Sequence, residues 1–134
     1  WLVEEIKENL PKELDFELEA ANAMRCDRVV KRGGFGCGVI VPATHPELTT
    51  KRILVMDFED GMALTATAAE CAEANLKPRE IVKRFSEVYA EMVFLEGFLH
   101  CDPHPGNVLI RNHHTAPGGF QLILLDHGLY REIP

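Results

Sequence analysis

The C-terminal part of the sequence, from Pro78 onward, places a polar loop between a long amphipathic helix and two short apolar runs. From Pro78 to Glu96, apolar side chains recur every three or four residues, which predicts a helix with one buried face. Two prolines interrupt the polar segment His100–Asn107 and argue against a helix there. The apolar runs Val108–Ile110 and Phe120–Leu125 follow, separated by a glycine-bearing turn, and predict a β-hairpin. The expected fold class is therefore α+β.

The preceding part of the chain alternates predicted helices with short predicted strands. Apolar side chains at helical spacing predict one helix from Trp1 to Leu10 and another from Lys12 to about Lys31. The glycines between positions 33 and 38 end the second helix. The remaining predicted elements are a strand at Val39–Val41, a buried strand at Ile53–Phe58 before an Asp60-Gly61 turn, and a short helix around Ala66–Ala74.

Composition narrows the possible classes of function. The chain has 134 residues, 46% of them hydrophobic, with a formal net charge of −7 and a pI near 5.3, which is typical of a globular domain. An acidic chain without a basic run is a poor candidate for nucleic-acid binding. No stretch approaches the ~20 apolar residues that span a bilayer. The cysteines form no Cys-x-x-Cys pair, so we expect free thiols.

Three polar residues frame the predicted hairpin. Asp102 and Asn107 lie in the loop before it, and Asp126 directly follows its second apolar strand. A carboxylate at that position needs a partner, and a cation is a common one. The spacing Asp-x4-Asn, hairpin, Asp-x-Gly is what phosphoryl transfer on a kinase scaffold requires. Asp102 would orient the attacking hydroxyl, while Asn107 and Asp126 would bind the Mg²⁺ that bridges the phosphates of ATP.

Two other readings of this loop are open. His100 and His104 have the spacing of a zinc-binding pair on a helix, but the prolines make a helix improbable and no third ligand has suitable spacing. A solvated loop with an N-capping aspartate is the second reading.

The glycines of Gly34-Phe-Gly36-Cys-Gly38 resemble a phosphate-binding loop. Because no lysine follows in Val39–Pro42 and the glutamate-rich helix comes before them, we interpret them as a helix-ending turn.

With these residues identified, the chain resembles the UbiB/ADCK family of atypical protein-kinase-like proteins (aarF-domain-containing kinases). Four blocks carry the resemblance, namely Glu13-Leu-Asp-Phe-Glu-Leu-Glu-Ala-Ala-Asn22, Ile53-Leu-Val-Met-Asp-Phe-Glu-Asp-Gly61, Gly97-Phe-Leu-His-Cys-Asp-Pro-His-Pro-Gly-Asn107 and Leu125-Asp-His-Gly-Leu129. Their order and coverage of the chain are specific to this family, and the last two blocks look most like its mitochondrial animal subgroup.

The resemblance implies roles for residues outside the loop. Glu19 would be the helix-C glutamate that pairs with a nucleotide-positioning lysine, and Met56, Asp57, Phe58 and Glu59 would form the hinge that contacts adenine. Glu13 and Asp15 would be the family's Glu-x-Asp motif, which contacts an N-terminal extension. Without the resemblance, a solvated acidic helix start is the preferred reading of Glu13, Asp15 and Glu19.

By the same resemblance, three positions of this sequence differ from those of ordinary protein kinases. His104 takes the place of a frequent lysine and, when protonated, would stabilise phosphate charge. Cys101 takes the place of the arginine that grips a phosphorylated loop, and His127 that of the phenylalanine beside the metal-binding aspartate. The nucleotide loop and strand lysine would precede Trp1. Residues 1–134 would then be a fragment of one domain, with 1–58 in the N-lobe and 59–134 beginning the C-lobe, and inactive alone.

The expected fold is thus a partial protein-kinase-like fold, with helix C, N-lobe strands, hinge, helix E, catalytic loop and metal-binding hairpin. The resemblance implies an ATP- and Mg²⁺-dependent kinase or ATPase of mitochondria, linked to lipid or ubiquinone metabolism. Contact with lipid or the mitochondrial membrane would come from regions outside the fragment. Two alternatives are a nucleotide-binding pseudokinase scaffold and a small-molecule phosphotransferase of the aminoglycoside or choline kinase type.

Overall fold

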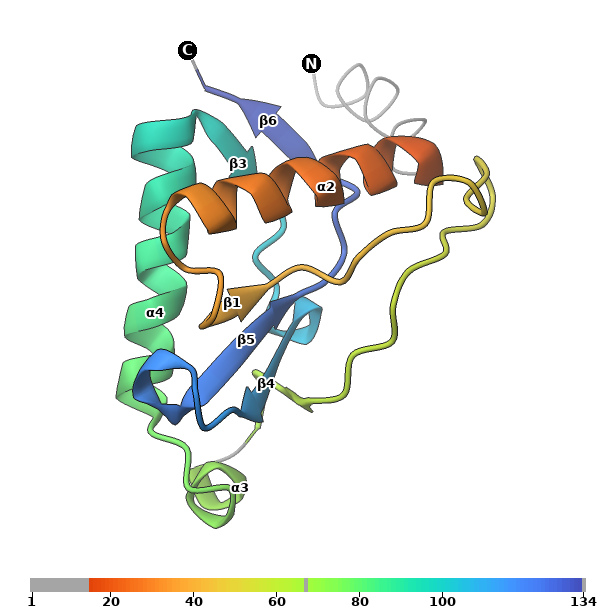
Figure 1. Ribbon diagram of the computed structural model, residues 1–134. Coiled ribbons are helices and arrows are strands. Elements are labelled where there is room, and N and C mark those ends of the chain that lie inside the picture. The colour runs from red at the N-terminus through yellow and green to blue at the C-terminus, as the bar shows by residue number, and fades with distance from the viewer. Residues whose placement is uncertain (1–14, 67, 134) are drawn as a thin grey trace, which may run out of the picture.

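A β-hairpin forms the centre of the molecule, and earlier parts of the chain pack around it. The computed structural model describes residues 15–66 and 68–133 (Figure 1). Strands β4 (Val108–Asn112) and β5 (Phe120–Leu124) pair antiparallel, with Val108 opposite Leu124, and every residue of β5 is buried. The predicted hairpin is confirmed, and its burial explains why its second strand is apolar except at Gln121, whose side chain is hydrogen-bonded to Arg111 and to the carbonyl of Cys37.

Two more strands extend the hairpin into a four-stranded mixed sheet of order β1-β5-β4-β2. The predicted strand at residue 39 is confirmed as β1 (Val39–Ile40), which runs parallel to β5. Strand β2 (Met62–Ala63) pairs antiparallel with β4, and the sequence pattern did not predict it. The predicted Asp60-Gly61 turn is wrong. Gly61 instead permits close approach to β4, because a Cβ there would lie 2.9 Å from the Cβ of Leu109.

Helices cover this sheet on two sides (Figure 1). Helix α2 (Phe16–Arg32) ends at Gly33, as the glycines predicted, and residues 1–14 of the predicted N-terminal helices lie outside the described residues. Helix α4 (Pro78–Glu91) continues as the π-helical segment η1 (Met92–Glu96) and ends at Gly97, whose φ of +58° suits glycine. The predicted short helix is α3 (Ala68–Glu73).

A second, two-stranded sheet lies beside the polar loop. Strand β3 (Phe98–His100) pairs antiparallel with β6 (Tyr130–Glu132), and neither was predicted. Two short 3-10 turns complete the region, η2 (Pro105–Asn107) before β4 and η3 (Pro117–Gly119) before β5. His100 therefore lies in a strand and His104 precedes a 3-10 turn, so the pair does not share a helix face.

The prediction of a buried strand at residues 53–58 is wrong. This segment makes only isolated bridges, Thr50 with Ile53 and Thr44 with Met56. Three of its apolar side chains are exposed, with Ile53 at 59%, Met56 at 43% and Phe58 at 91%, whereas Leu54 and Val55 are half-buried. The described residues supply no neighbouring strand on which these side chains could be buried, and residues 41–61 form a long outer loop (Figure 1).

The hydrophobic core lies between α2, α4 and the main sheet, with Val29, Val88 and Leu122 among its buried members.

All four cysteines are free thiols, as expected. The α+β class is confirmed, whereas the division at residue 58 stays a prediction. Within residues 15–66 and 68–133, no helix combines the length and apolar character needed to cross a bilayer.

Candidate functional site

An open cleft of about 470 Å³ lies where α2 faces the loop after β3 and the turn after β5. Six residues line it: Glu19, Cys101, Asp102, Asp126, Gly128 and Leu129. Three of the predicted site residues, Glu19, Asp102 and Asp126, thus share one cavity although they come from separate parts of the sequence. Their three carboxyl groups make the cleft acidic.

The hairpin brings Asn107 to the edge of this cleft. The side-chain amide of Asn107 donates to Oδ2 of Asp126 over 3.1 Å, although 19 residues separate them. The backbone pairing of β4 with β5 extends one step further here, because the N–H of Leu125 donates to the carbonyl of Asn107 over 2.8 Å. An amide and a carboxylate at this distance offer oxygen atoms of the type that Mg²⁺ binds. The carboxylate of Asp126 and the amide oxygen of Asn107 are therefore candidate ligands for a divalent cation.

Asp126 has an unusual backbone conformation. Its φ is +55°, in the left-handed region that non-glycine residues seldom adopt. Its Oδ1 accepts the N–H of Gly128 over 3.3 Å, and its Oδ2 faces Asn107. A strained backbone of this kind persists only when surrounding contacts hold it.

His127 is buried beneath the cleft. Its Nε2 donates to the carbonyl of Leu124 over 3.1 Å, so its Nδ1 accepts from the hydroxyl of Tyr130 over 2.9 Å. Burial lowers the pKa of His127 to about 4, and the ring is therefore neutral at pH 7. The imidazole occupies a core position, with both nitrogens satisfied.

Helix α2 contacts the backbone of this same residue. Oε1 of Glu19 accepts the N–H of His127 over 3.1 Å, and the amide of Asn22 donates to its carbonyl over 3.0 Å. Glu19 is buried, and this desolvation raises its pKa. The reading of Glu19 as a solvated helix residue is therefore wrong.

The loop that carries Asp102 is held by His100. The backbone N–H of Asp102 donates to Nδ1 of His100 over 3.1 Å. His100 is itself buried, which lowers its pKa, so its ring is available as a neutral acceptor. Burial also raises the pKa of Cys101, which favours a protonated thiol at the cleft wall. The carboxylate of Asp102 thus lies at the cleft on a backbone that is anchored beneath it.

Two predicted site residues have local structural roles outside the cleft lining. Nδ1 of His104 accepts the N–H of Gly106 over 3.0 Å and caps η2. Asp15 caps α2 by accepting the N–H of Glu17 over 3.1 Å, and lies 3.7 Å from the ammonium of Lys51. Glu13 lies outside the described residues.

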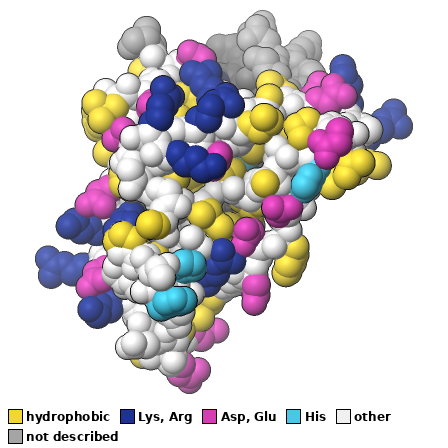
Figure 2. Space-filling model, viewed as in Figure 1, with side chains coloured by type: hydrophobic (Ala, Val, Ile, Leu, Met, Phe, Trp, Pro, Cys, Tyr) yellow, Lys and Arg dark blue, Asp and Glu magenta, His cyan; other side chains and the backbone are white. Residues whose placement is uncertain are grey.

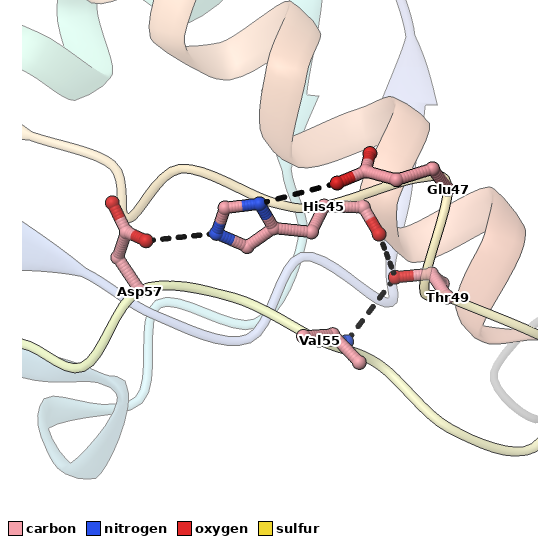
Figure 3. A network of polar contacts seen from close by, with 5 residues as sticks. All are labelled: His45, Glu47, Thr49, Val55 and Asp57. Atoms are coloured by element: carbon pink, nitrogen blue, oxygen red, sulfur yellow. Dashed lines mark hydrogen bonds and ion pairs between the residues drawn. The ribbon is translucent and has the colours of Figure 1, made fainter.

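The predicted hinge residues lie in the outer loop and do not line the cleft. The N–H of Asp57 donates to the carbonyl of Ala43, and its carboxylate contacts Nε2 of His45 over 2.8 Å (Figure 3). The carboxylate of Glu47 approaches the other ring nitrogen, and Glu59 pairs with Arg111 over 2.6 Å. Met56 makes a single bridge and Phe58 is exposed.

Sequence reasoning missed the role of Asn22 and the cleft wall formed by Gly128 and Leu129. Asn22 does stand three residues after Glu19, a spacing that places both side chains on one helix face. That spacing was a usable signal, but the sequence does not reveal which backbone groups this face contacts.

The chain is similar to known proteins along its whole length. The ABC1 atypical kinase-like domain family matches residues 1–134. An AarF domain-containing protein kinase 1 of Mus musculus is 43% identical over 131 residues, covering 98% of this chain and 24% of the relative. A probable serine/threonine-protein kinase of Dictyostelium discoideum is 39% identical over 132 residues, covering 98% and 18% respectively.

An AarF domain-containing kinase 1 of Drosophila melanogaster is 37% identical over 133 residues, covering 99% of this chain and 24% of the relative. The chain thus spans about a quarter or less of the length of these curated relatives. A family match over all 134 residues, with relatives above 30% identity, shows the family. The chain belongs to the ABC1 (AarF-domain) family of atypical kinase-like proteins.

Proposed function

We propose that this chain supplies the Mg²⁺ ligands and the catalytic carboxylate of an ATP-dependent atypical kinase or ATPase. The observation that carries the proposal is the 3.1 Å contact between Asn107 and Asp126 at the edge of a cleft that Asp102 lines. Nucleotide phosphates bring their own negative charge, so an acidic cleft of this kind needs a divalent cation to bind them.

The residues have distinct roles in this proposal. Asn107 and Asp126 would hold Mg²⁺, which would supply positive charge to offset that of the nucleotide phosphates. Asp102 accepts or orients the proton of the attacking hydroxyl or water, and its carboxylate faces the same cavity. His104 is exposed near Asp102, where its protonated form would stabilise phosphate charge at the cost of its contact with Gly106.

The kinase-like elements extend the proposal to the rest of the fold. In this assignment α2 is helix C, α4 is helix E, and residues 56–59 are the hinge that contacts adenine. Glu13 and Asp15 then contact an N-terminal extension. Glu19 pairs with a nucleotide-positioning lysine outside residues 1–134 while its Oε1 accepts the N–H of His127.

The cellular setting rests on family resemblance. The proposed location is the mitochondrion, with a role in lipid or ubiquinone metabolism, and membrane or lipid contact made outside these residues. Transfer to a protein, transfer to a lipid and hydrolysis of ATP all need the same Mg²⁺–nucleotide site.

Thermal unfolding of the full-length protein tests the site. ATP with Mg²⁺ at ~100 times its Kd stabilises a protein by about 2.7 kcal/mol and raises its Tm visibly. We expect this rise in the wild type and its loss in Asp126→Ala. The matched control is Glu73→Ala, which removes an exposed carboxylate of α3 far along the chain from the cleft.

A rise in Tm that needs both Mg²⁺ and Asp126 supports the site, and no rise in the wild type contradicts it.

Measurement of turnover then separates an enzyme from a nucleotide-binding scaffold. Asp102→Asn keeps the side-chain size and removes the carboxylate. We expect a fall in kcat with little change in nucleotide Kd; equal turnover in both proteins would remove Asp102 from the mechanism.

A further inference from the structure

The left-handed turn at Asp126 is held by contacts that come from outside its own strand. Asp126 has a φ of +55°, and this conformation points its Oδ2 at the amide of Asn107. Within the turn, the Asp126 side chain accepts the N–H of Gly128 over 3.3 Å, and the buried His100 of β3 contacts the Asp126 backbone from outside it. The long bond to Gly128 is by itself a weak restraint on a strained conformation.

The next residue is held from both sides of its backbone by α2. Glu19 accepts the N–H of His127 over 3.1 Å, and Asn22 donates to the carbonyl over 3.0 Å. These two contacts join parts of the chain that are 108 and 105 residues apart. Because they fix the peptide groups on each side of His127, they also limit the rotation of Asp126, which shares the first of those groups.

The two α2 side chains are not equivalent. Glu19 lines the cleft and has a role in the proposed function, whereas Asn22 is outside the cleft lining and donates a hydrogen bond to the carbonyl of His127. The helix is anchored independently by its buried face and by Arg25, which lies 3.9 Å over the ring of Phe98 in β3. Loss of the Asn22 amide therefore leaves the helix packed and frees one side of the turn.

We infer that Asn22 is a positioning residue that sets the Mg²⁺ affinity of Asp126 by holding the carbonyl of His127. Asn22 contacts neither metal nor nucleotide in this account. It restricts the turn to the conformation in which Asp126 and Asn107 face the same point. The inference rests on the proposed function, because it assigns Asp126 to the metal.

The test uses the full-length protein and two asparagine variants. Asn22→Ala removes the amide, and Asn22→Asp keeps its size but replaces the donor with a carboxylate that repels the carbonyl. The matched control is Asn112→Ala, because Asn112 likewise donates to a backbone carbonyl, that of Ala74, over 2.7 Å. A third variant, Asn22→Gln, restores an amide donor on a longer side chain.

Two readouts are measured for each protein. Amide hydrogen exchange at His127 and Gly128, without ligand, reports the turn itself. Calorimetric titration of Mg²⁺ in the presence of ADP reports metal affinity, and titration of ADP without Mg²⁺ reports nucleotide binding alone. We expect Asn22→Ala to exchange faster in the turn and to bind Mg²⁺ about tenfold more weakly, the size of effect seen when residues that orient metal ligands are removed.

Binding of ADP without Mg²⁺ should stay within about twofold in Asn22→Ala, since that amide is not expected to touch the nucleotide. Asn22→Asp should lose at least as much Mg²⁺ affinity, Asn22→Gln should recover part of it, and Asn112→Ala should match the wild type. Unchanged exchange in Asn22→Ala overturns the inference, as does unchanged Mg²⁺ affinity or an equal loss in both titrations. A wild type that binds no Mg²⁺ with ADP overturns the proposed function first, and the metal part of the inference with it.

Discussion

The turn at Asp126–Gly128 and the outer loop at residues 41–61 are stabilised in opposite ways. In the turn, the buried His127 is contacted by the side chains of Glu19 and Asn22 from α2, by that of Tyr130 from β6, and by a backbone carbonyl of β5. In the outer loop, Asp57 and Glu47 contact His45 on an exposed surface, and isolated bridges together with a hydrogen bond from the N–H of Val55 to the hydroxyl of Thr49 join its two arms (Figure 3). Buried hydrogen bonds hold one geometry, whereas exposed ion pairs contribute little and weaken with salt.

The sign of the surface charge also differs between helix α2, which contacts the turn, and the outer loop. Figure 2 shows Lys and Arg side chains gathered over the part of this face where α2 lies, and acidic side chains together with a His on the side of the outer loop. In the turn region the bonds that position Asp126 are internal, so we expect them to be insensitive to salt. The predicted hinge residues Asp57 and Glu59 instead pair with His45 and Arg111, and pH or salt changes the strength of such ion pairs.

Truncation of an apolar side chain should separate the two regions most strongly. Leu122→Ala in β5 removes a fully buried side chain and should lower the free energy of unfolding by about 2–5 kcal/mol. Ile53→Ala in the outer loop removes a side chain that is 59% exposed and should change it by less than about 0.5 kcal/mol. Urea unfolding of the full-length protein measures both. A cost for Ile53→Ala comparable to that of Leu122→Ala would show that the outer loop is packed against another part of the protein.

A smaller effect should follow from changing the acceptor on α2. Glu19→Ala leaves the N–H of His127 without its partner, which costs about 1–3 kcal/mol for a buried donor. Glu19→Gln keeps an oxygen acceptor and removes the buried charge, so it should cost less than Glu19→Ala. Urea unfolding at pH 7 compares the two. Equal losses in both variants would mean that the charge of Glu19, not its contact with His127, stabilises this region.

The smallest effect concerns the exposed histidine of the outer loop. Hydrogen bonding to Asp57, with further attraction from Glu47, raises the pKa of His45 above 6.5. Since the folded value exceeds the unfolded one, the contribution of this contact to stability is complete below pH 6.5 and is lost as pH rises through the raised value. NMR titration should give a lower pKa in Asp57→Asn and an unchanged one in Asp60→Asn, an exposed carboxylate of the same loop. Equal values in wild type and Asp57→Asn would contradict the contact.

The regular elements followed from local patterns in the sequence. The apolar periodicity of α4, the glycine that ends α2 and the two apolar runs of the hairpin all predicted elements that the structure contains. The same hairpin explains why Asn107 and Asp126 could be predicted to meet: two paired strands with a local turn leave their ends adjacent.

Elements that depend on distant partners were not predictable in this way. The strands β2, β3 and β6 have two or three residues each, too few for a periodic pattern. Residues 53–58 carry strand-forming side chains, but pairing decides whether they form a ladder. The spacing of Asn22 from Glu19 places both on one helix face, but the sequence does not show that Asn22 contacts a backbone carbonyl 105 residues away.

A double-mutant cycle on Mg²⁺ affinity tests the central claim, that Asn107 and Asp126 hold one ion. Mg²⁺ is titrated with ADP present into the wild type, Asn107→Ala, Asp126→Ala and the double variant. We predict that each single variant binds Mg²⁺ about tenfold or more weakly, and that the double variant is no weaker than Asp126→Ala, because ligands of one ion act together. An Asp126→Ala variant with wild-type affinity, or losses that simply multiply in the double variant, would contradict a shared metal site.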